Sequence, residues 1–358
     1  MEGSTMVVVS RNSEMEQFNL NSLVRENVKR LKPYSSARDE YKDFDAEMVF
    51  LDANENPFEN GVNRYPDPQQ RSLKAVLALQ KRVLENQILL GNGSDEVLDL
   101  IFRAFCEPHI DTIITLPPTY GMYKVLAETN AVANIEVLLT KNFEPDIETI
   151  LSKIEKTTKL LFICSPNNPT ANSFSVTRIE KLLTGFNGMV IIDEAYIDFS
   201  KEDSWVSRLG EFPNLMVTQT LSKAYGMAGV RLGICFASKE IIQILNKIKP
   251  PYNENALTQQ RALERVGDQD SVALEIKKIL FERERMEKSL SSIGFIESIF
   301  PSDSNFILVR VDDAQLRYEQ MISKGIVVRN RSTQPLCENT LRFTVGTKEE
   351  NNKLITAL

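Results

Sequence analysis

Residues 215–237, LMVTQTLSKAYGMAGVRLGICFA, are the stretch of this chain that decides the fold. Two apolar runs, 215–220 and 231–237, are typical of strands buried on both faces of a sheet. Between them lies a loop of small residues that carries Lys223 and ends at Arg231. Because α/β proteins place ligand contacts where strands end, this stretch predicts an α/β sheet with a functional lysine at its edge.

Further apolar runs alternate along the chain with segments of helical pattern. The runs at 112–116, 159–164 and 189–193 are short and rich in Ile, Leu and Val, whereas residues 146–156, DIETILSKIEK, have apolar residues at helical spacing. Buried strands that alternate with helices are typical of a parallel sheet covered on both faces. We therefore expect a large α/β domain over residues 56–255.

The pattern changes after KPPYNEN, residues 249–255. One long charged helix is expected over about residues 256–293, as a bridge between domains. Three apolar runs follow, with one helix between the first two: 305–311, 325–329 and 340–345. They predict a small α+β domain over residues 256–358.

Residues 1–55 have no core pattern of their own. They carry one helical stretch, NLNSLVRENVKRL at 19–31, followed by loops rich in Pro and Asn. We expect an N-terminal arm that packs on the small domain or on a partner subunit. Its first residues, about 1–20, are expected to be a disordered extension.

Composition excludes several classes of partner. The net charge is −7 and the chain has no long basic run, so we expect no nucleic-acid partner. No stretch approaches the ~20 apolar residues needed to span a bilayer, and the N-terminus does not read as a signal peptide. We therefore expect no membrane partner.

The few cysteines and the single histidine limit the kinds of active site that this chain could have. The four cysteines form no CxxC motif and predict buried free thiols of a cytoplasmic protein. His109 is the single histidine, so a site with several histidine ligands is impossible and we expect no metal. A Ser-His-Asp hydrolase would need His109 as its base, and a loop histidine at a helix end is the better interpretation.

A glycine-rich turn joins an apolar strand to a helix at residues 88–105, ILLGNGSDEVLDLIFRAF. Gly93 and the main-chain N–H groups that follow it could cradle an anion, most often a phosphate, at the positive end of the helix. The alternative is simple helix capping by Ser94 or Asp95, which this motif alone favours.

Two more polar motifs follow buried strands. Asn168 lies in SPNNPTA (165–171) after one strand, and Asp193, Glu194 and Tyr196 end another in MVIIDEAYIDF (189–199). Alternation of sides predicts that Asp193 and Glu194 point to opposite faces. A plain turn at Asn168 and a solvent-exposed acid at Asp193 are the alternatives.

Together, these motifs bring an anion cradle, an acid, a lysine and an arginine to one edge of one sheet. Pyridoxal 5′-phosphate (PLP) needs all four. Its aldehyde forms a Schiff base with a lysine, its ring nitrogen pairs with an acid, and its phosphate binds a helix N-terminus and an arginine. The motifs therefore predict a PLP site.

In this order, the motifs resemble those of the aspartate-aminotransferase-like (fold type I) PLP enzymes, and most closely the histidinol-phosphate aminotransferase family. The resemblance runs from RENVKRLKPYSSAR (25–38) to LRFTVG (341–346). It implies a mostly parallel seven-stranded sheet covered by helices, with a small α+β C-terminal domain and an N-terminal arm. It further implies a PLP-dependent aminotransferase that exchanges the amino group of glutamate with imidazole acetol phosphate in histidine biosynthesis. Ala171 departs from the usual NPTG motif.

Residue roles follow from the same resemblance. Lys223 would be the Schiff-base lysine and the proton-transferring base, Asp193 would bind the pyridine nitrogen, and Tyr196 the phenolic oxygen. These are the implied catalytic residues. The remaining implied cofactor ligands are Gly93, Ser94, Asp95, Tyr120, Asn168, Thr220, Ser222, Arg231 and, from the neighbouring subunit, Tyr65.

The substrate side is also implied by resemblance. Arg342 matches the arginine that clamps a substrate carboxylate, and Arg329 matches a second arginine of the histidinol-phosphate enzymes. Tyr34 and Asn54 would line the same pocket. The role of Tyr65 implies a homodimer with shared active sites. For Arg329, a surface charge at a strand end is the alternative interpretation.

Three other functions stay open at this point. A threonine-phosphate decarboxylase and a broad aromatic aminotransferase share most of these motifs. A non-enzymatic PLP-binding module would need a fused nucleic-acid-binding segment, for which residues 1–50 have neither the length nor the charge.

Overall fold

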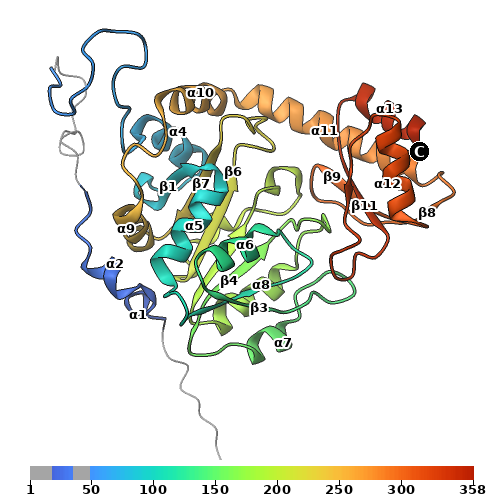
Figure 1. Ribbon diagram of the computed structural model, residues 1–358, viewed down its shortest axis with the longest axis horizontal. Helices are drawn as coiled ribbons and strands as arrows, with labels where there is room; N and C mark the ends of the chain where they lie inside the picture. Colours follow the sequence, from blue (N-terminus) through green and yellow to red (C-terminus); the bar gives the residue numbers. More distant parts are fainter. Residues whose placement is uncertain (1–17, 35–48) are drawn as a thin grey trace, which may run out of the picture.

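Two lobes of unequal size make up the chain (Figure 1). The computed structural model describes residues 18–34 and 49–358. The larger lobe is built on a central sheet, and the smaller lobe, which includes the C-terminus, lies at the far end of the long helix α11 (Figure 1). This arrangement agrees with the predicted fold class, a large α/β part with a small α+β part.

The central sheet has seven strands among the described residues, in the order β1-β7-β6-β5-β4-β2-β3. All neighbours are parallel except β7, which is antiparallel to both β1 and β6. The mostly parallel seven-stranded sheet is thus confirmed. The strands are β1 (Ile88–Asn92), β2 (Thr112–Thr115), β3 (Ala133–Glu136), β4 (Thr158–Cys164), β5 (Met189–Asp193), β6 (Leu215–Thr220) and β7 (Leu232–Ala237).

Helices cover both faces of this sheet because its strands are apolar on both sides. In β5, Val190 and Ile192 join the core on one face, while Met189 and Ile191 join the core on the other. The first core also receives side chains from α4 (Arg71–Lys81), α7 (Ile147–Ser152) and α8 (Val176–Gly185). The second receives them from α5 (Gly93–Phe105), α6 (Met122–Thr129) and α9 (Lys239–Ile248).

The small lobe pairs four strands in the order β10-β11-β9-β8, all antiparallel. Its separate core includes Met286 and Leu290 of α11. The elements are α11 (Gln269–Leu290), β8 (Ile296–Ile299), β9 (Phe306–Val311), α12 (Ala314–Ser323), β10 (Arg329–Asn330), β11 (Thr340–Thr344) and α13 (Lys348–Ala357).

The single helix expected over residues 256–293 is wrong, because the chain forms α10 (Ala256–Gly267) and then α11. Asp268 ends the first helix and caps the second, since its carboxylate accepts a hydrogen bond from Ser271 N. Ala262 and Val266 of α10 belong to a core of the large lobe. The proposed boundary at residue 255 therefore precedes a helix that packs on the large lobe.

The described part of the arm lies against the large lobe and forms two short helices, α1 (Leu20–Leu23) and α2 (Glu26–Arg30), where one was expected. Leu23, Val24 and Val28 are buried in the core beside α5 and α9. Arg25 also pairs with Glu107 at 3.0 Å. The predicted disordered extension, about residues 1–20, lies largely outside the described residues.

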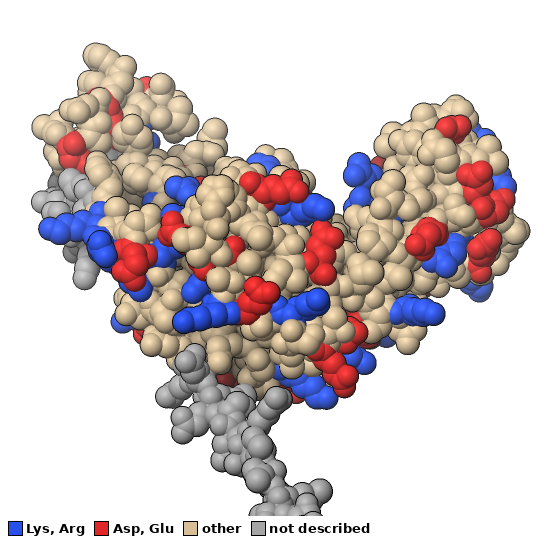
Figure 2. All heavy atoms as spheres, turned by 60° about the horizontal axis from the view of Figure 1, so that its bottom comes forward, with Lys and Arg blue, Asp and Glu red and all other residues tan. Residues whose placement is uncertain are grey.

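Three short 3₁₀ helices complete the described elements: η1 (Glu85–Gln87), η2 (Ile197–Phe199) and η3 (Trp205–Arg208). All four cysteines are buried free thiols, as predicted. Acidic and basic side chains are interspersed over the face in Figure 2. No helix within residues 18–34 and 49–358 is long and apolar enough to cross a membrane.

Candidate active site

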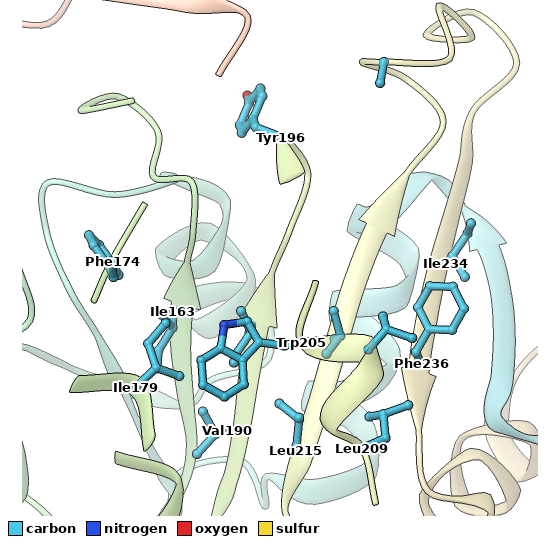
Figure 3. Close-up of a cluster of buried hydrophobic side chains, with 14 of the residues drawn as sticks. Ile163, Phe174, Ile179, Val190, Tyr196, Trp205, Leu209, Leu215, Ile234 and Phe236 are labelled. Atoms are coloured by element: carbon cyan, nitrogen blue, oxygen red, sulfur yellow. The ribbon is translucent and has the colours of Figure 1, made fainter. Parts of the chain in front are cut away.

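A polar cavity lies at the carboxyl ends of β4, β5 and β6, where most of the predicted cofactor residues meet. The parallel register places Cys164, Asp193 and Thr218 side by side across these strands. Figure 3 shows Tyr196 beyond the end of β5, above the aliphatic layer of the core. The lining residues are Ser94, Asp95, Tyr120, Cys164, Asn168, Asp193, Ala195, Tyr196, Thr220, Ser222, Lys223 and Arg231.

The turn from β1 into α5 forms the anion cradle. Gly93 has φ +74°, a conformation that favours glycine, and its N–H donates to the Arg231 carbonyl at 2.9 Å. A Cβ at this position would lie 2.5 Å from Nη2 of Arg231. Arg231 also donates to Ser222 Oγ at 3.4 Å and lies 3.7 Å from the Asp95 carboxylate. The main-chain N–H groups of the first turn and the Arg231 guanidinium thus meet at one point, which suits a phosphate.

Gly233, which the sequence analysis did not single out, lets α5 approach β7 this closely. A Cβ on Gly233 would lie 2.4 Å from both Gly93 C and Ser94 N. The position is therefore restricted to glycine by the backbone that forms the cradle. Its sequence signal, RLG at the start of a strand, carries no information about a partner 140 residues away.

Asp193 is a buried acid with one strong donor. Its carboxylate accepts hydrogen bonds from the Tyr123 hydroxyl at 2.7 Å and from Ala195 N at 3.2 Å. Burial raises the pKa of Asp193, and the bond from Tyr123 opposes that rise. Tyr123 is fully buried and was also missed, because it is one of two tyrosines in PTYGMY and only the ring-stacking Tyr120 was assigned a role.

Glu194 points to the opposite side of the strand, which confirms the predicted alternation. It accepts hydrogen bonds from Ser204 Oγ, Trp205 N and Gln219 Nε2 at 2.6, 2.6 and 2.7 Å. Burial raises its pKa to about 7. Glu194 therefore forms hydrogen bonds inside the large lobe, and of these two acids only Asp193 lines the cavity.

Lys223 reaches the cavity from the loop after β6. Its Nζ lies 5.9 Å from the centre of the Tyr196 ring. Although part of its side chain meets solvent, burial lowers the pKa of Lys223, and the charges of Arg342 and Arg231 lower it further. Tyr196 is buried, and burial raises the pKa of its phenol. A lysine whose pKa is lowered loses its proton more readily than an ordinary lysine, which suits covalent binding of an aldehyde.

Arg342 brings the small lobe into the site. It lies on β11, and its Nη1 donates to Asn168 Oδ1 of the large lobe. Its guanidinium lies 5.0 Å from the centre of the Phe306 ring, and its buried Nε has no hydrogen-bond partner among the described residues. Arg329 is paired with Arg342 in the β10–β11 register and is exposed. An unpaired buried donor of this kind is what an anionic substrate would satisfy.

Tyr34, Asn54 and Tyr65 gather elsewhere on the same chain. With Tyr252, they line a separate cavity. The Tyr65 ring stacks on that of Tyr252 with a centroid distance of 4.5 Å. The structure therefore does not bring these three predicted residues to the Lys223 cavity of their own chain.

The residues present fit PLP. The buried Asp193 meets the need of a protonated ring nitrogen, the cradle at Gly93 and Arg231 meets that of a phosphate, and Lys223 meets that of an aldehyde. Tyr120 lies beside them, held by a 3.1 Å hydrogen bond from its hydroxyl to Asp95. No group of three or more His, Cys, Asp or Glu side chains could hold a metal ion in the described part of the chain.

This fold and this site together define a PLP-dependent enzyme of the aminotransferase class. Comparison with known proteins agrees: the chain belongs to the family "Aminotransferase class I and II", whose model matches residues 39–358. PLP is the cofactor of that family and hence of this chain.

Individual relatives are closely similar over nearly the whole chain. The histidinol-phosphate aminotransferase of Flavobacterium johnsoniae is 64% identical over 345 residues, 96% of this chain and 99% of that one. The crystal structure of the enzyme of that name from Clostridium acetobutylicum matches with a TM-score of 0.77 at 26% identity, covering 83% of this chain and 90% of that one. The structure from Sinorhizobium meliloti, a complex with pyridoxal-5′-phosphate, matches with a TM-score of 0.76 at 24% identity, covering 82% of each chain.

Proposed function

We propose that this chain is a histidinol-phosphate aminotransferase that acts in the cytoplasm, in histidine biosynthesis. It would transfer the amino group of L-glutamate to imidazole acetol phosphate, giving 2-oxoglutarate and L-histidinol phosphate, and would catalyse the reverse reaction. The observation that carries the proposal is the 64% identity, over 96% of the chain, to a relative of that name. The Arg342 guanidinium, which donates to Asn168 and whose buried Nε has no hydrogen-bond partner among the described residues, supports an anionic substrate.

Asp193 and Lys223 carry the chemical roles in this reaction. When bound, PLP supplies an aldehyde that takes up the amino group and a cationic ring that draws electrons from the substrate α carbon. Asp193, held by Tyr123, stabilises the proton on the ring nitrogen. Lys223 Nζ, whose lowered pKa favours the neutral amine, moves the proton at the substrate α carbon.

The neighbouring groups bind and orient. Arg231, with the main chain at Gly93 and Ser94, holds the cofactor phosphate, and Tyr120 packs on the ring. Arg342 receives the α-carboxylate of glutamate in one half of the reaction and the phosphate of the other substrate in the second half, as a bidentate donor.

We further propose a homodimer in which each chain completes the other's site. The separate position of Tyr34, Asn54 and Tyr65 supports this, since in one chain they lie outside the Lys223 cavity. Exposed apolar side chains that flank Asn54 in the sequence also need a cover: Leu51 is 87% exposed and Phe58 79%. Light scattering of the PLP-bound protein should give twice the 40.6 kDa mass of one chain.

The test is glutamate-dependent turnover of imidazole acetol phosphate, run beside CO₂ release from threonine phosphate. We expect the first reaction and not the second. Lys223→Ala should lose both turnover and the near-visible absorbance of the lysine-bound cofactor, whereas the exposed Lys239→Ala should keep both. Full activity in Lys223→Ala would refute the role of the lysine, and CO₂ release without amino transfer would refute the assigned reaction.

A further inference from the structure

The sheet of the small lobe has one apolar face and one cationic face. Ile307 and Val309 of β9 and Leu341 and Phe343 of β11 point into the core of the small lobe. Because side chains alternate along a strand, the residues between them point to the opposite face. That second face carries Arg342, together with Phe306, whose ring lies beside its guanidinium.

Arg331 belongs to this second face. In β10, Arg329 pairs with Arg342, and the ladder continues by one more bond, from Arg331 N to the Thr340 carbonyl at 2.9 Å. Residues two apart in an extended strand share a side, so Arg331 lies on the same face as Arg329. Three arginines therefore lie on neighbouring positions of two paired strands.

These arginines lack the acids that would ordinarily balance them. Within residues 18–34 and 49–358, none of the observed ion pairs involves Arg329, Arg331 or Arg342. The buried Nε atoms of Arg331 and Arg342 have no hydrogen-bond partner there. Burial and the neighbouring guanidiniums lower the pKa of Arg331 to about 10. Unpaired, half-buried charges are costly in the free protein, so the arrangement favours a bound anion.

The cluster adjoins the catalytic cavity through Arg342 and the cavity residue Asn168. Arg342 is bonded to Asn168, and the charges of both Arg342 and Arg331 favour the ionised form of the Tyr196 phenol. Tyr196 lines the cavity with Lys223. An anion held by these arginines would thus lie on the small-lobe side of the reacting groups.

We infer that Arg331 is a third arginine of the substrate anion site and that it selects a phosphate monoester over a carboxylate. This inference rests on the proposed function, in which the enzyme binds a carboxylate substrate and a phosphate substrate in turn. A carboxylate has one charge and two oxygens, which one bidentate arginine can satisfy. A phosphate monoester has a charge of about −1.5 to −2 at pH 7 and three terminal oxygens, so it can use additional donors.

Arg331→Gln tests this inference because it removes the charge and keeps a polar side chain. We expect kcat/KM for histidinol phosphate to fall about 10- to 100-fold, the effect of losing one charge-assisted hydrogen bond. The glutamate half-reaction, followed by cofactor absorbance, should change less than about threefold. Arg331→Lys should restore part of the loss, since it returns the charge without the planar fork.

Arg310→Gln is the matched control. Arg310 lies on the same face of the sheet, and its buried Nε also has no hydrogen-bond partner among the described residues. It differs from Arg331 because its Nη2 donates to the Leu336 carbonyl at 3.1 Å and its guanidinium lies 5.7 Å from the Phe300 ring centre. Arg310→Gln should leave the ratio of kcat/KM for histidinol phosphate to that for glutamate unchanged. Equal losses for both substrates in Arg331→Gln, or no loss, would overturn the inference. If Arg331→Gln does not fold, the same ratio in Arg331→Lys decides the question.

Inorganic phosphate separates this inference from the proposed function. If the wild-type protein does not turn over histidinol phosphate, the proposed function fails, but phosphate can still be tested as a competitor of glutamate. A rise of about tenfold or more in the phosphate inhibition constant of Arg331→Gln would support the anion site. An unchanged inhibition constant would overturn it.

Discussion

Gly233→Ala is expected to damage the anion cradle by displacing the main chain at Gly93 and Ser94, although it removes no group that binds the cofactor. The added Cβ would lie 2.4 Å from Gly93 C and Ser94 N and 2.6 Å from Gly93 O. Ordinary contacts begin at 3.4 Å, so the start of α5 must move away from β7 by 3.4 − 2.4 = 1.0 Å. All three neighbours are main-chain atoms, which cannot rotate aside.

Two measurable losses follow from this displacement. Overpacking of a close-packed interior costs about 1–3 kcal/mol, which should lower the free energy of unfolding of the PLP-free protein. The N–H groups of the first turn of α5 would also move relative to Arg231, so PLP should bind more weakly, by about tenfold for each 1.4 kcal/mol of lost interaction. Denaturant unfolding measures the first loss, and titration of the protein with PLP, followed by absorbance, measures the second.

Gly210→Ala is the control for the general effect of replacing a glycine by alanine, because a Cβ at Gly210 would have no atom within 4 Å. It should match the wild-type protein in both measurements. The steric reasoning would be refuted if Gly233→Ala bound PLP and unfolded like Gly210→Ala.

Two further predictions concern buried acids. Tyr123→Phe keeps the ring that stacks on Phe162 at 4.9 Å but removes the donor to Asp193. The pKa of Asp193 should rise, and PLP affinity should fall by about 10- to 100-fold, the value of a hydrogen bond to a charged group; unchanged affinity would contradict the role of Tyr123. Burial raises the pKa of Glu254 from 4.5 to about 8, so the folded chain keeps a proton that the unfolded chain releases above pH 4.5. Relative to Glu254→Gln, the wild-type protein should therefore lose about 1.4 kcal/mol of its free energy of unfolding per pH unit between pH 5.5 and 7, and this loss should level off above pH 8. Denaturant unfolding of both proteins at several pH values measures this difference. If the two free energies changed with pH in parallel, this titration of Glu254 would be excluded.

Strand ends were predictable from the sequence because the signal is local. A run such as MVIID followed by polar residues reports both a buried strand and the point where its side chains meet solvent or a ligand. Asp193 and Lys223 were found in this way, and the register of β4, β5 and β6 explains why such residues meet. Edge strands gave a weaker signal: the partly exposed β3 (Ala133–Glu136) lacks the apolar run of a buried strand.

Contacts between distant segments could not be predicted, because nothing in a local pattern reports them. Gly233 is restricted by the backbone at Gly93, and Tyr123 by a carboxylate 70 residues away. The break between α10 and α11 is a different case. Gly267 and Asp268, followed by Ser271, form a recognisable helix end and cap that the continuous charged pattern concealed.

Positive charges from both lobes act on the amine of Lys223. Burial lowers the pKa of Lys223, and Arg342 on the small lobe and Arg231 on the large lobe lower it further because each adds positive charge near the amine. Arg231 is only loosely balanced by Asp95, at 3.7 Å, and no ion pair to Arg342 occurs among the described residues. A phosphate bound at Arg231 and a substrate anion bound at Arg342 would each neutralise one of these charges. The pKa of the free amine should therefore rise with each anion that binds, so that Lys223 is the strongest base when both anions are in place.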